Sequence, residues 1–315
     1  MQSYAAITRS LFLLFLATQS ASGGLERYSG LIMADAQEHP VPQDGVRVTY
    51  LGTNGYQFEA ANQVLLVDPY FSRVGWVAMI FGVAIQPNVA RIDEGLKHLA
   101  RRADAVLVTH GHVDHLLDVP FIMQRRGARL IASATAIDLA EAAGAPPKRC
   151  IKVTAGDVRQ VGPWKIRVLA AAHDRVFPIG VPFRGPRKGN TAPKKASEWV
   201  CGEPLAYLIE VRGKRIYIDA GGTGALLPQP NIGPVDLAIL GVALPDSRAR
   251  FAEAVRRLRP RYILPSHQDD FLRPLGRKFV FGPLTDFPRV LRDYKREHLS
   301  GQLILLDYFR PWTLR

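Results

Sequence analysis

Cysteine, acidic residues and long apolar segments are all scarce in this chain of 315 residues. The two cysteines, Cys150 and Cys201, belong to no metal-binding cysteine motif, and no low-complexity tract, internal repeat or clear linker divides the sequence. The chain is 47% hydrophobic and 22% charged, which is the composition of a globular protein. At this length its core needs no disulfides or metal ions to be stable. The composition therefore excludes an intrinsically disordered protein and a fibrous protein.

The deficit of acidic residues gives a formal net charge of +13, from 41 Lys and Arg against 28 Asp and Glu. Such a charge favours acidic partners such as phosphorylated substrates, lipid head groups or nucleic acid. A general bias of the proteome would produce the same charge, so the charge alone does not choose a partner. The two cysteines could form a disulfide if the protein is exported, although we favour two separate buried thiols.

No segment of the sequence is apolar over a transmembrane length, but one apolar stretch lies near the N-terminus. There Arg9 precedes an apolar stretch, Leu11–Ala17, and small residues follow from Thr18 to Gly24. This order is typical of a secretory signal, and the stretch is too short to span a bilayer as a permanent helix. We predict that residues 1–24 are a signal peptide or an N-terminal anchor. A cleaved signal peptide would export the protein to the periplasm or the extracellular space, and an uncleaved anchor would hold it at a membrane through its N-terminus. The remaining alternative is that the start codon is mis-chosen and these residues are not part of the protein.

Strand and helix patterns alternate from about residue 45 onward. The segments VRVTYL, YQFEA and QVLLVD predict three short antiparallel strands. A helix is predicted over residues 90–102, a second helix ends at Gly127, and residues 205–222 read as a hairpin that turns at Gly213. Hairpins mixed with strand–helix units predict two sheets with helices outside them.

Three of the chain's eight histidines lie together in the stretch ADAVLVTHGHVDHLLD, residues 103–118. One residue separates His110 from His112, so both side chains leave an extended segment on the same face, and Gly111 allows a tight turn between them. Asp114 and His115 follow where the chain enters the next helix. Histidine and aspartate are usual ligands of zinc and similar divalent metals. The pattern predicts half of a metal site.

The missing ligands are expected at other strand ends, because a sheet delivers the ends of its strands to one cleft. His173 ends the run IRVLAAAH, Asp219 follows KRIYI, and His267 ends RYILPSH. A lone histidine at a strand end usually only makes a hydrogen bond. Because of the cluster at His110, we interpret His173 and His267 as metal ligands instead. We interpret His39, His98 and His298 as surface residues.

With these residues in place, the chain resembles the metallo-β-lactamase-fold hydrolases. The pattern THGHVDH, followed in order by one histidine, one aspartate and one histidine, matches the ligand series of that superfamily. The segment YLGTNGYQFEAANQVLLVDPYFS also resembles the branch with ascorbate-6-phosphate lactonase-like and N-acyl-phosphatidylethanolamine phospholipase D-like proteins. By this resemblance, a first metal is held by His110, His112 and His173, a second by Asp114, His115 and His267, and Asp219 bridges the two.

The resemblance implies a four-layer αββα sandwich for a hydrolase domain over residues 45–315. It also implies two divalent metal ions, with zinc as first choice and manganese or iron as alternatives, and an orienting role for Asp68. A hydroxide that bridges the ions would attack an ester-type bond in a phosphodiester, phospholipid or lactone. Asp114 and Asp219 would be the catalytic carboxylates: Asp114 orients the hydroxide and Asp219 sets the spacing of the ions.

Three other functions compete with this hydrolase. A nuclease or nucleic-acid binder would use the net charge, and export argues against it. A mononuclear iron oxidoreductase of the same fold, similar to a persulfide dioxygenase, would contain iron and an inert second site. A non-catalytic surface protein that retains the fold is the third alternative, and the complete ligand set argues against it.

Two stretches bear on the substrate and on membrane contact. Residues 74–85, VGWVAMIFGVAI, are too few to span a membrane, and we favour a core helix over an interfacial lip. Residues 183–199 are rich in Pro, Gly and cations and form either a solvated loop or a cationic flap. If the lip and the flap are real, an anionic small-molecule or lipid substrate and a peripheral membrane contact are expected. The substrate contacts would then be Trp76, Phe81, Arg184 and Lys188. The sequence leaves the oligomeric state open.

Overall fold

The computed structural model describes residues 24–36, 40–176, 180–187, 189–220 and 232–315. The predicted signal segment therefore lies, up to residue 23, outside the described residues. Within the described ranges, no helix is long and apolar enough to cross a membrane. The described chain begins with a 3₁₀ segment, η1 (Leu25–Leu31).

The first of two mixed sheets contains the predicted opening meander. Its strands β1, β2 and β3 pair antiparallel, and β3 to β6 continue in parallel. Strand β14 pairs antiparallel with β1 at the other edge. In spatial order the strands are β14 (Pro311–Leu314), β1 (Val46–Gly52), β2 (Gly55–Ala60), β3 (Gln63–Val67), β4 (Ala105–Leu107), β5 (Arg129–Ala132) and β6 (Cys150–Lys152).

The second sheet contains the predicted hairpin, formed by β9 and β10 around Gly213, whose φ is 75°. Strands β7 to β10 are antiparallel, and β10 to β13 are parallel. In spatial order the strands are β13 (Gln302–Leu303), β12 (Tyr262–Ser266), β11 (Leu237–Gly241), β10 (Lys214–Ile218), β9 (Leu205–Val211), β8 (Trp164–Ala170) and β7 (Val158–Val161).

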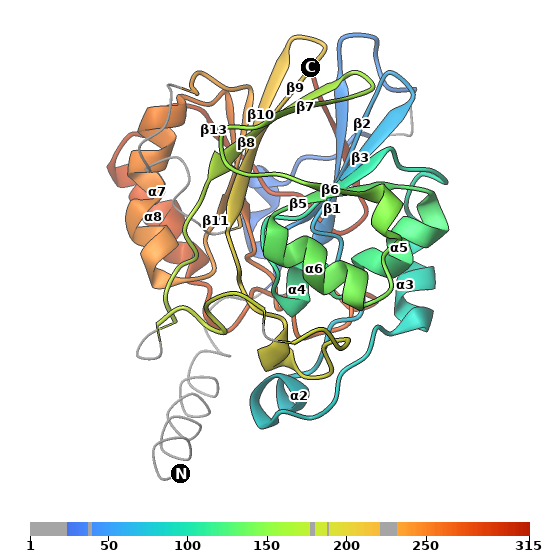
Figure 1. The fold of residues 1–315 in the computed structure, drawn as a ribbon. Helices are drawn as coiled ribbons and strands as arrows, with labels where there is room; N and C mark the ends of the chain where they lie inside the picture. The colour runs from blue at the N-terminus through green and yellow to red at the C-terminus, as the bar shows by residue number, and fades with distance from the viewer. Residues whose placement is uncertain (1–23, 37–39, 177–179, 188, 221–231) are drawn as a thin grey trace.

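Helices cover the outer faces of both sheets, so the predicted αββα sandwich is confirmed (Figure 1). Near the first sheet lie α3 (Val89–Leu96), α4 (Val113–Leu116), α5 (Val119–Arg126), α6 (Ala134–Ala142) and the short η2 (Pro147–Arg149). Near the second lie α7 (Pro245–Leu258) and α8 (Phe287–Arg296). Beyond the end of the sandwich lie α2 (Trp76–Phe81) and η3 (Ala196–Glu198).

The two-residue period of the strands divides the apolar side chains between two cores. In β3, Leu65 and Val67 join the core between the sheets, whereas Val64 and Leu66 join the core beneath α3 to α6. This alternation follows because successive side chains of a strand point to opposite faces. A strand buried on both faces is therefore apolar throughout, as the sequence QVLLV is.

Of the two predicted helices, one ends earlier than expected and the other ends where it was expected to. The helix predicted over residues 90–102 ends at Leu96, because the backbone N–H of Ala100 donates to the side-chain oxygen of Gln57 on β2, at 2.9 Å, instead of continuing the helix. Gly127 ends α5 as predicted, with a φ of 72°.

The reading of residues 74–85 as a core helix is wrong. In that segment Trp76 is 37% exposed, Val77 46%, Phe81 60% and Val83 48%. Helix α2 is short, begins after Gly75 and ends at Gly82, and contacts η3 beyond the end of the sheets. Its position outside both layers leaves one apolar face in solvent.

Cys150 and Cys201 are both free thiols, as we favoured. Burial raises the pKa of Cys150 to about 11, with Glu141 adding to the shift, and raises the pKa of Cys201 to about 12. Because the thiolate is the reactive form, alkylation of the native protein at pH 8 should be slow. Denaturation should release two reactive thiols without reductant. Intact mass after alkylation checks this, and a denatured protein that takes up label only after reduction would contradict it.

Candidate metal centre

All seven predicted metal ligands follow strands whose ends meet at one edge of the sandwich. The loop after β4 carries His110 and His112, and α4 begins immediately behind it. His173 follows β8, Asp219 follows β10, and His267 follows β12 directly. The structure places six of these side chains in two groups of three, and Asp219 belongs to neither group.

The first group consists of His110, His112 and His173. One ring nitrogen of each lies within 4.8 Å of those of the other two. His110 Nε2 is 2.9 Å from His112 Nδ1, and the other nitrogen of His112 donates to the carbonyl oxygen of Pro182 at 3.0 Å. His173 Nδ1 donates to the backbone oxygen of Asp174 at 2.7 Å. Backbone partners of this kind fix which nitrogen of an imidazole faces a metal.

The second group consists of Asp114, His115 and His267, again with one ligand atom each within 4.8 Å. Asp114 Oδ2 is 3.0 Å from His267 Nε2 and 3.4 Å from His115 Nε2. The two groups adjoin, because the ring centroids of His110 and His115 are 4.1 Å apart.

The protonation states of both groups suit a cation. Burial lowers the pKa of His112 to about 3 and that of His173 to about 4, and it holds the pKa of His110 well below its ordinary value. Neutral imidazole is the form that binds metal. Burial alone would lower the pKa of His115, but Asp114 and Asp68 beside it raise it to about 10. These carboxylates favour a positive charge there, which a metal ion would supply.

The donor atoms of the two groups support the same conclusion. Histidine nitrogens and carboxylate oxygens are the donors that zinc and related divalent ions take, at about 2.0–2.2 Å. The residues present therefore fit two divalent ions.

Asp219 is buried and held from two sides. The hydroxyl of Tyr217 donates to its Oδ2 at 3.0 Å, and the backbone N–H of Gly241 donates to its Oδ1 at 3.3 Å. Its place after β10 brings it to the same edge of the sheet as His267 after β12. Its bridging role remains a prediction.

Asp68 orients His115. Its Oδ2 lies 2.8 Å from His115 Nδ1, so that nitrogen donates to Asp68 and Nε2 is left to face the second group. Asp68 also accepts from Asn54 and from the backbone and hydroxyl of Thr109. The carboxylate is thus held rigidly behind the ligand, in the arrangement that fixes the tautomer of a metal-bound histidine.

We predict that Asp68→Asn lowers metal affinity or activity by about 10- to 100-fold. The amide cannot accept as strongly from Nδ1, so His115 would lose its fixed tautomer. Metal titration followed by activity at saturating metal measures the effect. The matched control is Asp104→Asn, which changes a partly buried acceptor of the Val64 backbone, at 2.7 Å, away from the histidines. Equal behaviour of the two variants would contradict the orienting role.

Gly111 is required for close packing rather than for a left-handed turn. Its φ is not positive, but a Cβ there would lie 2.3 Å from the backbone oxygen of Val200 and 2.8 Å from Leu139. The backbone does bend at Gly111, as predicted, and glycine is needed there for the close approach of Val200 and Leu139. The absent side chain lets the loop of His110 and His112 pack against the segment that precedes β9.

Sequence reasoning missed the network behind His267. Asp269, two residues after His267, is buried and paired at 2.8 Å with the buried Arg73. It also accepts from the Thr53 backbone at 2.7 Å and from the hydroxyls of Tyr50 and Tyr308. His267 itself has a φ of 52°, and its N–H donates to the Thr53 oxygen at 2.8 Å. The network anchors the loop that carries this ligand.

A largely apolar cavity of about 270 Å³ opens onto both groups. His112, Asp114, His173 and His267 form its polar side. Its apolar lining includes Trp76, Met79, Phe183, Leu244, Phe271 and Leu272.

The predicted substrate contacts fall in different places. Trp76 lines the cavity, whereas Phe81 and Arg184 are exposed and lie outside its lining. Lys188 is outside the described residues. Phe183, next to Arg184, was not predicted, although its ring centroid lies 6.2 Å from that of His112.

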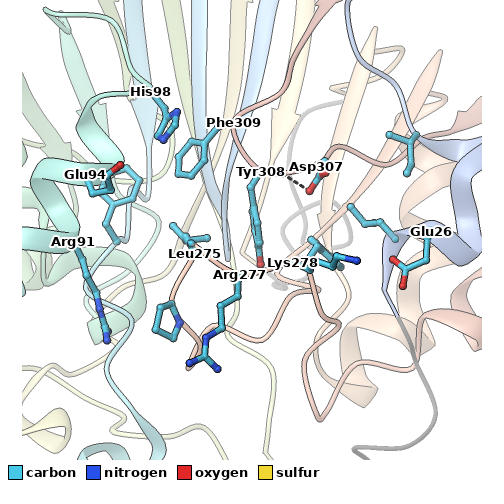
Figure 2. A pocket seen from close by; sticks show the side chains of 17 residues that line it. Glu26, Arg91, Glu94, His98, Leu275, Arg277, Lys278, Asp307, Tyr308 and Phe309 are labelled. Atoms are coloured by element: carbon cyan, nitrogen blue, oxygen red, sulfur yellow. Dashed lines mark hydrogen bonds between the residues drawn. The ribbon is translucent and has the colours of Figure 1, made fainter.

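A second cavity, of about 680 Å³, is lined in part by Tyr308 of the Asp269 network (Figure 2). His98 stacks on Phe309 along its wall, with ring centroids 4.3 Å apart. Its lining includes Arg277 and Lys278 as well as Glu26, Glu94 and Asp307, so it carries charges of both signs. His98 and His298 are exposed, as predicted, and His39 lies outside the described residues.

Comparison with known proteins identifies the family of this chain. A family model described as "Beta-lactamase superfamily domain" matches residues 63–267, which contain all seven predicted ligands. A UPF0173 metal-dependent hydrolase of Thermococcus kodakarensis is 28% identical over 230 residues, covering 70% of this chain and 84% of that protein.

Two solved structures share the fold. Igni18, a metallo hydrolase from Ignicoccus hospitalis, has a TM-score of 0.56 at 17% identity and covers 86% of this chain and 99% of that one. CmlA, a diiron beta-hydroxylase from Streptomyces venezuelae, has a TM-score of 0.52 at 16% identity and covers 88% of this chain and 55% of that one. At such identities these likenesses concern the fold alone. The family model, which matches well over half of the chain, shows that this protein belongs to the beta-lactamase superfamily domain family, as a metal-dependent hydrolase of the metallo-β-lactamase superfamily.

Proposed function

We propose that this protein is a dinuclear metal-dependent hydrolase that cleaves an ester-type bond. The observation that carries the proposal is the pair of adjoining ligand groups, His110 with His112 and His173, and Asp114 with His115 and His267. Each group offers three donors, and the rings of His110 and His115 bring the groups together. Zinc is our first choice of metal because nitrogen ligands dominate both groups; manganese and iron are the alternatives.

Two divalent ions held there would lower the pKa of a water and polarise the carbonyl or phosphoryl oxygen of a substrate. The chain's own residues prepare the place for this reaction. Asp114 supplies a buried carboxylate whose pKa is held well below its ordinary value. Burial alone would raise this pKa, but His115 and His267 lower it by more than burial raises it. It therefore stays ionised and can accept a hydrogen bond from the attacking water. Asp219, fixed by Tyr217 and Gly241, adds a second oriented carboxylate.

The walls of the cavity support an ester that carries an apolar group. Phe183, Phe271 and Leu272 exclude water from one side, while the histidines and Asp114 face the other. The net charge of +13 favours an anionic substrate. Phosphodiesters, phospholipids and lactones are thus the classes to test. Membership in the branch with lactonase-like and phospholipase D-like relatives stays a prediction.

We also propose that the mature protein is exported. The support is the sequence pattern of residues 1–24. Sequencing the N-terminus of protein purified from its own cells should find a start near residues 22–25. An intact Met1 would overturn cleavage.

One experiment tests the proposed function. Metal content of the purified protein is measured by elemental analysis, and the same sample is assayed against a phosphodiester, a lactone and a phospholipid. We expect close to two equivalents of metal and hydrolysis of at least one ester, lost with a chelator and restored by the metal. One equivalent of iron with no hydrolysis across the panel would overturn the proposal in favour of the iron oxidoreductase.

A further inference from the structure

The exposed apolar side chains of this protein gather on one short segment. Six large hydrophobic residues are exposed among those that the structure describes, and four of them lie between residues 76 and 83. These four, Trp76, Val77, Phe81 and Val83, form what we call the lip. Trp76 and Phe81 contact each other edge to face, with ring centroids 6.1 Å apart. Single exposed apolar residues are ordinary, but a cluster of this kind marks a contact surface.

Cations border the lip. The backbone N–H of Ile85 donates to the oxygen of Lys194 at 2.7 Å, so the segment of Lys194 and Lys195 runs beside the end of α2. A Cβ placed at Gly82 would lie 4.0 Å from the side chain of Lys195. Both lysines are exposed. Figure 1 shows α2 and the neighbouring η3 together at the end of the molecule away from the β9–β10 turn.

The lip is continuous with the cavity of the metal centre. Trp76 is 37% exposed and also lines that cavity, together with Met79 from the same helix. A surface pressed against the lip would therefore lie at the entrance to His112, Asp114 and His173.

We propose that the lip docks this protein on the surface of an anionic lipid bilayer. An apolar ridge that contains tryptophan, bordered by lysines, is complementary to a membrane interface, where the rings enter the head-group region and the cations meet acidic lipids. A second copy of the chain fits less well. A two-fold contact through the lip would bring Lys194 and Lys195 of both copies together, and like charges oppose that contact. The further idea that the substrate is an acyl ester taken from the bilayer rests on the proposed function. The docking itself does not depend on that function.

Trp76 provides the readout. It is the exposed one of the chain's four tryptophans, since Trp164, Trp199 and Trp312 are 5% exposed or less. The full mature protein is titrated with vesicles of phosphatidylcholine, with and without phosphatidylglycerol, at low and high salt. We expect a blue shift of the fluorescence, quenching by brominated acyl chains, and tighter binding to the anionic vesicles that weakens as salt is added.

Variants separate the two parts of the surface. Val77→Ser combined with Phe81→Ser should weaken vesicle binding by about tenfold or more, because both side chains lose their apolar burial. The matched control Val158→Ser, on β7, changes a valine that is 49% exposed and should have little effect. Lys194→Glu combined with Lys195→Glu should cost at least about fivefold on anionic vesicles, whereas R212E at the β9–β10 turn should not. Thermal denaturation verifies that each variant is folded.

Several outcomes would overturn the proposal. One is the absence of a blue shift with anionic vesicles. Another is equal binding by the lip variant and Val158→Ser. A dimer in analytical ultracentrifugation that the lip variant abolishes, without vesicle binding, would assign the lip to a second copy instead. Because no arm of this test measures hydrolysis, a failure of the proposed function would appear only in the metal and ester assays.

Discussion

Replacing His110 by alanine is expected to remove metal and activity together. His110 belongs to the first ligand group, is 2% exposed, and has its ring 4.1 Å from that of His115 in the second group. Its loss leaves two histidines for one ion and a cavity where the ring stood. Metal binding depends on the whole ligand set, so the affinity should fall with the geometry. Activity should fall by more than the 10- to 100-fold that the loss of an outer hydrogen-bond partner typically costs.

Elemental analysis and the ester assay on the same sample measure both effects. Asp219→Ala should behave similarly, because a carboxylate fixed by Tyr217 and Gly241 would be lost from the centre. The matched control is His98→Ala, which removes an exposed histidine that stacks on Phe309 and belongs to neither ligand group. Full activity of His110→Ala with unchanged metal content would refute the assignment of the centre.

Replacing Arg73 by methionine is expected to destabilise the fold by about 3–5 kcal/mol. Both members of the Arg73–Asp269 pair have side chains that are 0% exposed, and their contact is 2.8 Å. Methionine would leave the carboxylate of Asp269 buried without its cation. The Thr53 backbone and two tyrosine hydroxyls would still donate to it, but they carry no charge to balance it. Because this network anchors the loop of His267, metal binding should weaken as well.

Urea denaturation of the metal-free protein measures the free energy of unfolding. R73K keeps the charge and should lose less than Arg73→Met. The matched control is Arg125→Met, since Arg125 pairs with Asp93 at the surface, where the side chains are 50% and 47% exposed. Breaking such an exposed pair should cost about 0–1 kcal/mol. A cost for Arg73→Met no larger than that of the control would show that the buried pair does not stabilise this loop.

Local patterns in the sequence were sufficient for the sheets and for the order of the ligands. The alternation in VRVTYL and YQFEA predicted an antiparallel meander, and the structure pairs these strands so. The glycines that end α5 and turn the β9–β10 hairpin were predicted because a positive φ is easily adopted only by glycine. The positions of the predicted ligands follow from the same kind of pattern, since four of them come after the apolar strand β4 and the other three come after β8, β10 and β12. Strand ends share one edge of a sheet.

Only the tertiary structure decided which side chains meet. Arg73 and Asp269 are 196 residues apart, and no local pattern marks an arginine after DPYFS as the partner of an acid beyond His267. The grouping of His173 with His110, and of His267 with Asp114, was implied by the family resemblance and not by any local pattern, because it depends on how the strands before these residues pack in the fold. Residues 74–85 show the limit most clearly. Their apolar composition suits a core helix. An apolar helix is buried only where another element covers it, and α2 lies in space beyond the end of both sheets.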